Sequence, residues 1–319
     1  MSPKMSPKQP RYFAHYSHIS LGIINMFISA LFFAMMNACV KILSPSMSAV
    51  ESIFFRSIIM VVLLLGWFVY KPPRKKSKQG GWWLLCLRSL FGGLSMLALF
   101  YNITHISLGV ASTFSQTMPI YVVLLSMLFL KERVGFVVLF ATLLGFGGIV
   151  LICDPHFNSI PMLNIILGIL GGFMMALAFI SLRNLKGYFD DNVVVLVFGI
   201  TMSVVSLGIL IVQASMQSWQ AVWHTPSLSE WGIVLAMGIF GTFGQYFLTK
   251  AYMLAPAGIV APIDYTRVVF GLIFGIMLGD ALPHFGVGLG MVLVILSGII
   301  IGLPNLLKDL RSIKRSKNV

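Results

Sequence analysis

Long, unbroken runs of apolar residues dominate the chain, separated by short connections that hold turn formers such as Ser44-Pro45-Ser46 and Asp154-Pro155. A helix needs about 20 apolar residues to cross about 30 Å of membrane hydrocarbon. Ten runs of about this length predict an all-α integral membrane protein. The predicted spans are residues 19–40, 48–70, 82–104, 108–130, 134–152, 161–182, 192–213, 230–250, 257–279 and 285–304.

Composition supports this prediction, because 58% of the residues are hydrophobic and only 10% are charged. An ordinary soluble domain has about 25% charged residues. The first apolar run is too long for the apolar region of a signal peptide and lacks a cleavage site, so it is interpreted as a span. Cys39, Cys86 and Cys153 form no C-x-x-C pair and are interpreted as small buried hydrophobic residues.

The basic residues predict the orientation. Of the 22 lysines and arginines, nearly all lie in the two terminal segments and in alternate connections, whereas the opposite connections hold only Lys41. Lys and Arg accumulate on the cytoplasmic side of membrane proteins, so both termini are predicted to be cytoplasmic. A bacterial inner (plasma) membrane is the expected location. The net charge of +13 is therefore a topology signal with some attraction to lipid headgroups, and it predicts no nucleic-acid partner.

A weak internal repeat relates residues 106–132 to residues 254–280, at an offset of 148. In both stretches a turn of small residues opens a helix that closes on an acidic residue, Glu132 in the first and Asp280 in the second.

The repeat divides the chain into halves of five spans, residues 19–152 and 161–304, flanked by a cytoplasmic segment 1–18 and a basic cytoplasmic tail 305–319. Because five is odd, the second half must be inverted relative to the first. We therefore predict ten transmembrane helices arranged as an inverted 5+5 repeat, which is typical of secondary transporters.

Several stretches resemble the EamA family of the drug/metabolite transporter superfamily. They are Arg88-Ser-Leu-Phe-Gly92-Gly93, Ser107-Leu-Gly-Val-Ala and Phe129-Leu-Lys-Glu132 in the first half, and Ala251-Tyr252, Ala255-Pro256-Ala257 and Gly279-Asp280-Ala-Leu-Pro283 in the second. The resemblance implies a ten-helix carrier with cytoplasmic termini. The start of span 3 is most similar to a branch that includes S-adenosylmethionine and organic-anion carriers. One departure is Asp280, where the family usually carries Glu.

Charged residues inside spans are candidates for substrate binding, because a charge at the membrane centre costs about 2.5–3.5 kcal/mol on insertion scales. Arg88 lies in span 3, and Asp264 and Arg267, three residues apart in span 9, share a helix face. The alternatives are a structural Asp264–Arg267 ion pair and an Arg88 that reaches the headgroups. Arg56, close to Glu51 in span 2, is interpreted as a structural or headgroup-reaching residue.

Uncharged polar residues add further candidates. Gln116 falls at the repeat position that matches Asp264, which suggests that both line one cavity. The other candidate binding residues are Tyr101, Tyr265, Gln245 and Asn37. For each of them an interhelical hydrogen bond is the alternative role. Pro119 and Pro262 are predicted to kink spans 4 and 9. A stripe of glycines on span 9 is predicted to allow close packing and sliding; it comprises Gly271, Gly275 and Gly279.

These observations predict a secondary transporter of a small polar metabolite, zwitterionic or anionic, such as an amino acid, S-adenosylmethionine or a carboxylate. Arginine would bind the carboxylate, and Asp264 would meet an amine or carry a coupling proton. The alternatives are a broad exporter of drugs and apolar compounds, or a lipid flippase. Transport of such apolar cargo would survive loss of the buried charges.

An enzyme is not expected, because Asp264 has no evident second intramembrane carboxylate and no metal-binding motif is present. A nucleotide-binding Gly-x-x-x-x-Gly-Lys motif is also absent, so the energy must come from a gradient, an exchange partner or a separate subunit. The expected partners are a small-molecule substrate, membrane lipids and, as an option, a second copy in a homodimer. No cofactor or metal is expected.

Overall fold

The structure is a computed structural model that describes residues 18–73, 78–105, 114–153, 161–278 and 285–317. Within these ranges the regular elements are helices, apart from an isolated bridge between Lys186 and Phe189. The helices are α1 (His18–Leu43), α2 (Ala49–Tyr70), α3 (Trp82–His105), α5 (Met118–Phe129), α6 (Phe136–Cys153), α7 (Met162–Asn184), α8 (Asp191–Met216), α9 (Trp219–Val222), α10 (Leu228–Leu254), α11 (Ala257–Val260), the 3₁₀ helix η1 (Ala261–Tyr265), α12 (Thr266–Met277) and α13 (Phe285–Lys317).

Eight helical stretches in the described residues are long and apolar enough to cross a membrane, and α5 and α6 are shorter apolar helices. The prediction of an all-helical membrane protein is thus confirmed. Predicted span 9 corresponds to α11, η1 and α12 taken together, Ala257–Met277. The inverted arrangement of two five-span halves stays a prediction.

Capping residues define where several helices begin. Ser48 accepts a hydrogen bond from the Glu51 amide at 3.3 Å, and its own amide donates to the Glu51 carboxylate at 2.8 Å. Ser227 and Glu230 form the same capping box at the start of α10. Such reciprocal bonds satisfy amides that would otherwise lack partners at a helix start.

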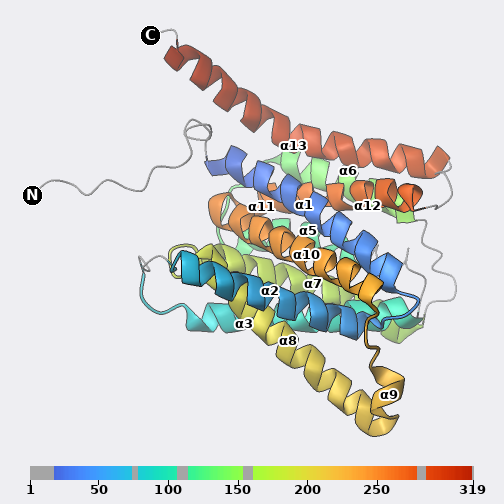
Figure 1. The fold of residues 1–319 in the computed structure, drawn as a ribbon. Helices are drawn as coiled ribbons and strands as arrows, with labels where there is room; N and C mark the ends of the chain where they lie inside the picture. The colour runs from blue at the N-terminus through green and yellow to red at the C-terminus, as the bar shows by residue number, and fades with distance from the viewer. Residues whose placement is uncertain (1–17, 74–77, 106–113, 154–160, 279–284, 318–319) are drawn as a thin grey trace, which may run out of the picture.

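Helices from the two halves of the chain interlock. α1 packs along α10, α3 along α7, α2 along α8 and α6 along α13. In Figure 1, α13, α6 and α12 form one side of the bundle, α1, α10, α5 and α11 lie across its middle, and α2, α3, α7 and α8 form the other side. Each main pair joins a helix before residue 154 to one after residue 161. The core is therefore shared, and neither half folds around a core of its own.

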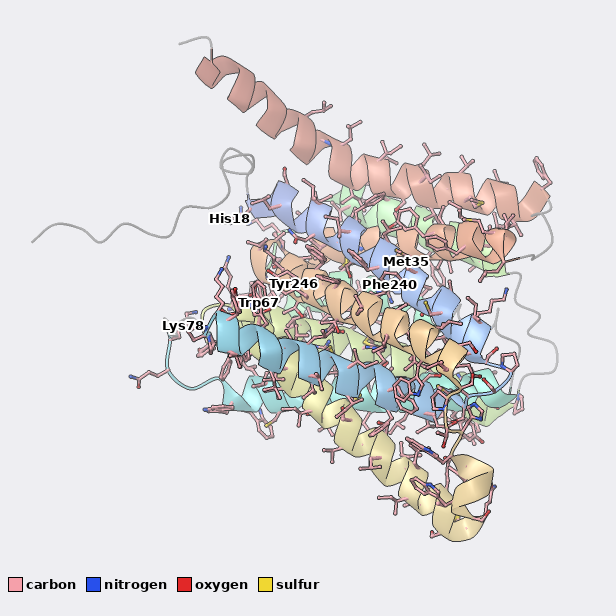
Figure 2. All side chains as sticks on the ribbon, viewed as in Figure 1. His18, Met35, Trp67, Lys78, Phe240 and Tyr246 are labelled. Carbon is pink, nitrogen blue, oxygen red and sulfur yellow. The ribbon has the colours of Figure 1, made fainter. Side chains whose placement is uncertain are left out.

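At the ends of the bundle, connections between helices lie close together although they are far apart in sequence. Figure 2 shows His18, Trp67 and Lys78 at the same end. There the Lys78 amide donates to the carbonyl of Gly187 at 3.0 Å, which joins the α2–α3 connection to the α7–α8 turn. This is the end that the distribution of basic residues predicts to be cytoplasmic.

Two details differ from the sequence predictions. The helix that contains span 10 does not end at residue 304, because α13 continues through Pro304 to Lys317. The close packing expected at Gly271 is not seen, since a methyl group there would meet nothing within 4 Å. Gly275 is buried, and Gly279 lies outside the described residues.

Candidate functional site

Arg88 of α3 is buried in the middle of the bundle, with 2% of its surface exposed. Its guanidinium lies over the rings of Phe198 and Phe179, at 4.5 Å and 5.4 Å from their centroids. Nε and Nη1 have no hydrogen-bond partner in the described part of the chain. The aromatic faces stabilise the charge through cation–π attraction but leave its hydrogen-bond donors unsatisfied. Headgroup contact, the alternative for Arg88, does not fit this degree of burial.

Asp264 and Arg267 form the predicted ion pair. Nη2 of Arg267 donates to Oδ1 of Asp264 at 2.6 Å, and only 1% of Asp264 is exposed. The Arg267 guanidinium also lies over the ring of Phe33 on α1, at 4.4 Å from its centroid. Asp264 lies in η1, where the α-helical part of the span is interrupted at Pro262, whereas Arg267 lies in the first turn of α12.

Arg56 corrects an expectation, because it neither pairs with Glu51 nor reaches the membrane edge. Its side chain is buried against α10, where a methyl group on Gly241 would lie 3.1 Å from its Cγ. Nε has no partner among the residues described, and Arg56 interacts electrostatically with Arg267 and Arg88. Glu51 instead caps α2 and accepts a hydrogen bond from the His224 amide.

Tyr252, near the end of α10, completes this group of residues. It is fully buried, and its ring packs on Phe179 with centroids 4.7 Å apart. Its hydroxyl has no hydrogen-bond partner within the described ranges, and it interacts electrostatically with Arg88, Asp264 and Arg267. We refer to Arg56, Arg88, Tyr252, Asp264 and Arg267 as the central cluster.

The central cluster is electropositive. It holds three guanidinium groups and one carboxylate, and that carboxylate is already paired with Arg267. Three positive charges against one negative charge leave a formal excess of two. Buried charges normally have partners, so this excess favours an anion as the missing partner.

A second polar network lies at the end predicted to be cytoplasmic. Nε of Arg183, at the end of α7, bonds the Glu132 carboxylate at 3.2 Å, and its Nη1 bonds the carbonyls of Tyr252 and Met253 at 3.3 Å and 3.1 Å. Glu132 also accepts from the Gly258 amide at 3.3 Å. We call these contacts the Glu132–Arg183 network. It joins the ends of α5, α7 and α10 and the start of α11.

Positive charge gathers beside this network. Partial burial, together with the neighbouring charges of Arg183 and Lys78, lowers the pKa of Lys186.

At the opposite end the contacts differ: the His224 ring lies 3.2 Å from Glu230, which also accepts a hydrogen bond from Ser46. Each end of the bundle therefore has polar contacts between the first and the second half of the chain.

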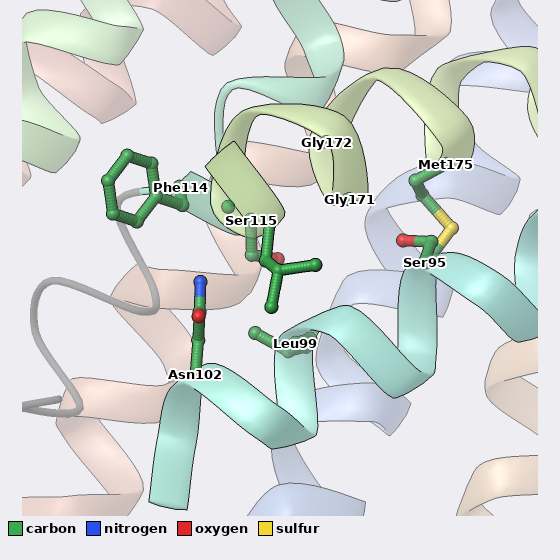
Figure 3. A pocket seen from close by; sticks show the side chains of 10 residues that line it. Ser95, Leu99, Asn102, Phe114, Ser115, Gly171, Gly172 and Met175 are labelled. Carbon is green, nitrogen blue, oxygen red and sulfur yellow. The ribbon is translucent and has the colours of Figure 1, made fainter. Parts of the chain in front are cut away.

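A small cavity lies between α3, α7 and the segment before α5 (Figure 3). Its volume is about 20 Å³, which is room for about one water molecule. Ser95 and Asn102 line it from α3, and Gly171 and Gly172 from α7. Arg88, Ser95 and Asn102 are spaced seven residues apart, so the cavity lies on the face of α3 that also carries Arg88.

The structure brings some predicted residues together and not others. Arg88, Asp264 and Arg267 meet in the central cluster, and Gln245 is buried on α10, on the face that carries Tyr252. Tyr265, the residue after Asp264, is buried and packs with Ile149, Val269 and Val294. Tyr101 (38% exposed) and Asn37 both lie on the surface of the bundle.

Gln116 and Asp264, which occupy matching positions of the internal repeat, both lie where a helix is interrupted. Gln116, which is buried, sits in a turn before α5, and Asp264 sits in η1 before α12. Pro119 occupies the first turn of α5, and Pro262 lies inside η1. Pro is compatible with a first turn but cannot donate within a continuing helix, which accounts for both positions.

Sequence reasoning missed Tyr252 and Arg183 as functional candidates. Tyr252 carried one usable signal, its place in the Ala251-Tyr252 stretch that resembles the family. Arg183 was interpreted only as one of the basic residues that indicate orientation, because a basic side chain at the end of a span usually faces water and headgroups. The Arg183 side chain reaches Glu132 because α5 and α7 pack together. The spacing of residues along one helix does not reveal that packing.

The fold and its buried charges define a polytopic membrane protein with a polar centre. Residues 20–153 and 162–303 each match the EamA-like transporter family. The chain therefore belongs to this family, which confirms the resemblance, and the family match indicates a small-molecule transporter.

Similar proteins include an uncharacterized transporter of Helicobacter pylori, 45% identical over 92% of this chain and 99% of that one. The pseudopaline exporter CntI of Pseudomonas aeruginosa is 29% identical over 87% and 94%. An S-adenosylmethionine uptake transporter of Rickettsia conorii is 24% identical over 61% and 63%. One solved crystal structure has a TM-score of 0.74 at 15% identity, covering 89% of this chain and 97% of the other, which shows the fold alone.

Proposed function

We propose that this chain is a secondary transporter that carries a small carboxylate-bearing anion through the central cluster, by alternating access between two inverted halves. The observation that carries the proposal is the pair of buried guanidinium groups, Arg56 and Arg88, that lack an acidic partner in the described residues. A carboxylate is the natural ligand of such groups, because charge-assisted hydrogen bonds to Arg are short and strong.

The structure favours an anion over a zwitterion. In the zwitterion hypothesis Asp264 would meet an amine, but its carboxylate is already bonded to Arg267. A substrate with two negative charges would balance the two excess positive charges of the central cluster. The names of the relatives do not determine the cargo, because they differ in both cargo and direction: one is named for export of pseudopaline and another for uptake of S-adenosylmethionine.

The packing of the helices supports alternating access between inverted halves. If spans 1–5 correspond to spans 6–10, the α1–α10 pair (spans 1 and 8) and the α3–α7 pair (spans 3 and 6) exchange under the repeat. The α2–α8 and α6–α13 pairs each map onto themselves. All four pairs are among the main contacts of the fold. A bundle with this pattern can rock one way or the other around a central site.

The test uses purified protein and a thermal-shift screen of succinate, glutamate, S-adenosylmethionine and apolar drugs. We expect succinate to stabilise the protein, and Arg88→Gln to weaken that binding about tenfold or more, since a hydrogen bond to a charged group is worth about 1.5–3 kcal/mol. Lys250→Gln is the matched control, because Lys250 lies over the Tyr246 ring on the same helix as Tyr252 but outside the central cluster.

Equal binding by wild type and Arg88→Gln would contradict the anion site. Stabilisation by apolar drugs alone, unaffected by Arg88→Gln, would support the alternative of a broad apolar exporter. Arg267 is a poorer choice for this test, because its removal leaves Asp264 buried without a partner and would destabilise the fold for a structural reason.

A further inference from the structure

Tyr252 is the one residue of the central cluster that also contacts the Glu132–Arg183 network. Its side chain packs on Phe179, the ring that also lies beneath the Arg88 guanidinium. Its backbone carbonyl accepts a hydrogen bond from Arg183 at 3.3 Å. Tyr252 therefore shares the Phe179 ring with Arg88 and bonds directly to Arg183 of the ion pair at the end of the bundle.

The hydroxyl of Tyr252 needs an explanation. It is fully buried and has no hydrogen-bond partner in the described ranges. An unsatisfied buried hydroxyl destabilises a fold, and phenylalanine would fill the same space without that penalty. The hydroxyl is a donor placed in electrostatic contact with Arg88, whose Nε and Nη1 are unsatisfied too. Both side chains pack on Phe179 and both carry unused donors, which favours an acceptor with negative charge as their shared partner.

We propose that Tyr252 donates a hydrogen bond to the anionic group of the substrate beside Arg88, and that binding there weakens the Glu132–Arg183 network. This rests on the proposed function, because it assumes that the cargo is an anion bound at the central cluster. It adds a specificity-determining residue and a link between cargo binding and one end of the transporter.

Electrostatics gives the direction of the link. Tyr252 interacts electrostatically with Glu132 as well as with Arg88. A carboxylate bound at the hydroxyl brings a negative charge toward Glu132 and repels it, while it attracts Arg183. Both effects oppose the Glu132–Arg183 ion pair. A ligand that binds better when the ion pair is broken shifts the population toward that state.

The decisive variant is Tyr252→Phe, which keeps the ring on Phe179 and the carbonyl that binds Arg183. With succinate as the probe, we expect roughly a tenfold loss of affinity by calorimetry. Without succinate, the melting temperature should stay equal or rise, because a buried unsatisfied hydroxyl is gone. A purely structural role would lower the melting temperature and leave the affinity unchanged, and that result would overturn the proposal.

The link between substrate binding and the Glu132–Arg183 network is measured by hydrogen exchange of the Gly258 amide, which donates a hydrogen bond to Glu132 in the structure. Saturating succinate should speed exchange in the peptide that contains Gly258 in wild type, and much less in Tyr252→Phe. Unchanged or slower exchange in wild type would overturn the link. Tyr246→Phe, on the same helix beside Lys250, is the matched control and should behave as wild type.

The outcomes separate the two proposals. If succinate and the other carboxylates fail to bind wild type, the proposed function is wrong and this inference is wrong with it. If succinate binds wild type and Arg88→Gln abolishes binding while Tyr252→Phe leaves affinity unchanged, the anion site stands and the role of Tyr252 is wrong.

Discussion

At the residue scale, the position of the Arg88 guanidinium depends on Gly92, one turn further along α3. A methyl group on Gly92 would collide with Nη1 of Arg88 and lie 3.1 Å from the Phe198 ring. Glycine therefore leaves the room in which the guanidinium lies flat against Phe198. Arg88 and Gly92 also belong to the motif that resembles the family, so the motif has a steric explanation here.

Gly92→Ala should displace the guanidinium and weaken succinate binding about tenfold, because overpacking a tight site costs about 1–3 kcal/mol. The matched control is Gly93→Ala, whose new methyl would meet the flexible end of Met202, with Cε at 2.8 Å and Sδ at 4.0 Å. Calorimetry on both variants checks this. Equal affinities for Gly92→Ala and Gly93→Ala would show that the guanidinium does not need this space.

The sequence identified Arg88, Asp264 and Arg267 because charges inside apolar runs are conspicuous. It misjudged Arg56, because proximity to Glu51 and to the end of a span says nothing about which helix the side chain faces. Tyr252 was overlooked for a related reason. A tyrosine in an apolar helix has no distinctive pattern, and its importance comes from neighbours on α3, α7, η1 and α12 that only the fold brings together.

At the element scale, α3 and α7 are joined by a reciprocal pair of amides. Nδ2 of Asn102 donates to the backbone carbonyl of Asn164 at 3.0 Å, and Nδ2 of Asn164 donates to Oδ1 of Asn102 at 3.1 Å. Both side chains are buried, and Asn102 also lines the small cavity. The alternative of an interhelical hydrogen bond, weighed for several polar residues in the spans, is the role that Asn102 has.

Asn164→Ala should therefore lower stability without changing anion affinity. Interhelical side-chain hydrogen bonds in membranes are worth about 0.6 kcal/mol on average and up to about 1.7 kcal/mol. A double-mutant cycle with Asn102→Ala, measured by reversible unfolding in detergent micelles, should give a coupling free energy in this range. A coupling near zero would mean that the amide pair adds nothing to the α3–α7 contact.

Hydrophobic pattern predicted the helices well where they are continuous and less well where they are interrupted. α2 and α7 begin and end within two residues of their predicted ends. Span 9 instead divides into α11, η1 and α12, since a run of apolar residues looks the same whether its backbone is α-helical or 3₁₀. Pro262 indicated the interruption but not its extent, which depends on the packing of η1 against α1, α5, α6 and α13.

At the scale of the whole molecule, the main pairs of packed helices are those that a two-fold relation between two five-span halves would exchange or keep, and the inverted form of that relation is a prediction. In an inverted repeat, equivalent connections of the two halves lie on opposite sides of the membrane. The α1–α2 connection and the α7–α8 connection are equivalent, because they join spans 1 and 2 and spans 6 and 7. A parallel repeat would place both on the same side, so labelling these two connections separates the arrangements.

Ser44 and Asn184 are suitable labelling positions, because both are exposed and neither carries a charge whose loss could disturb orientation. In a background without Cys39, Cys86 and Cys153, a membrane-impermeant maleimide should label Ser44→Cys in intact cells, and Asn184→Cys only after permeabilisation. The basic residues around Asn184 hold it in the cytoplasm under this arrangement. Labelling of both positions from one side would exclude the inverted repeat, and with it the rocking of mirror-related halves around the central cluster.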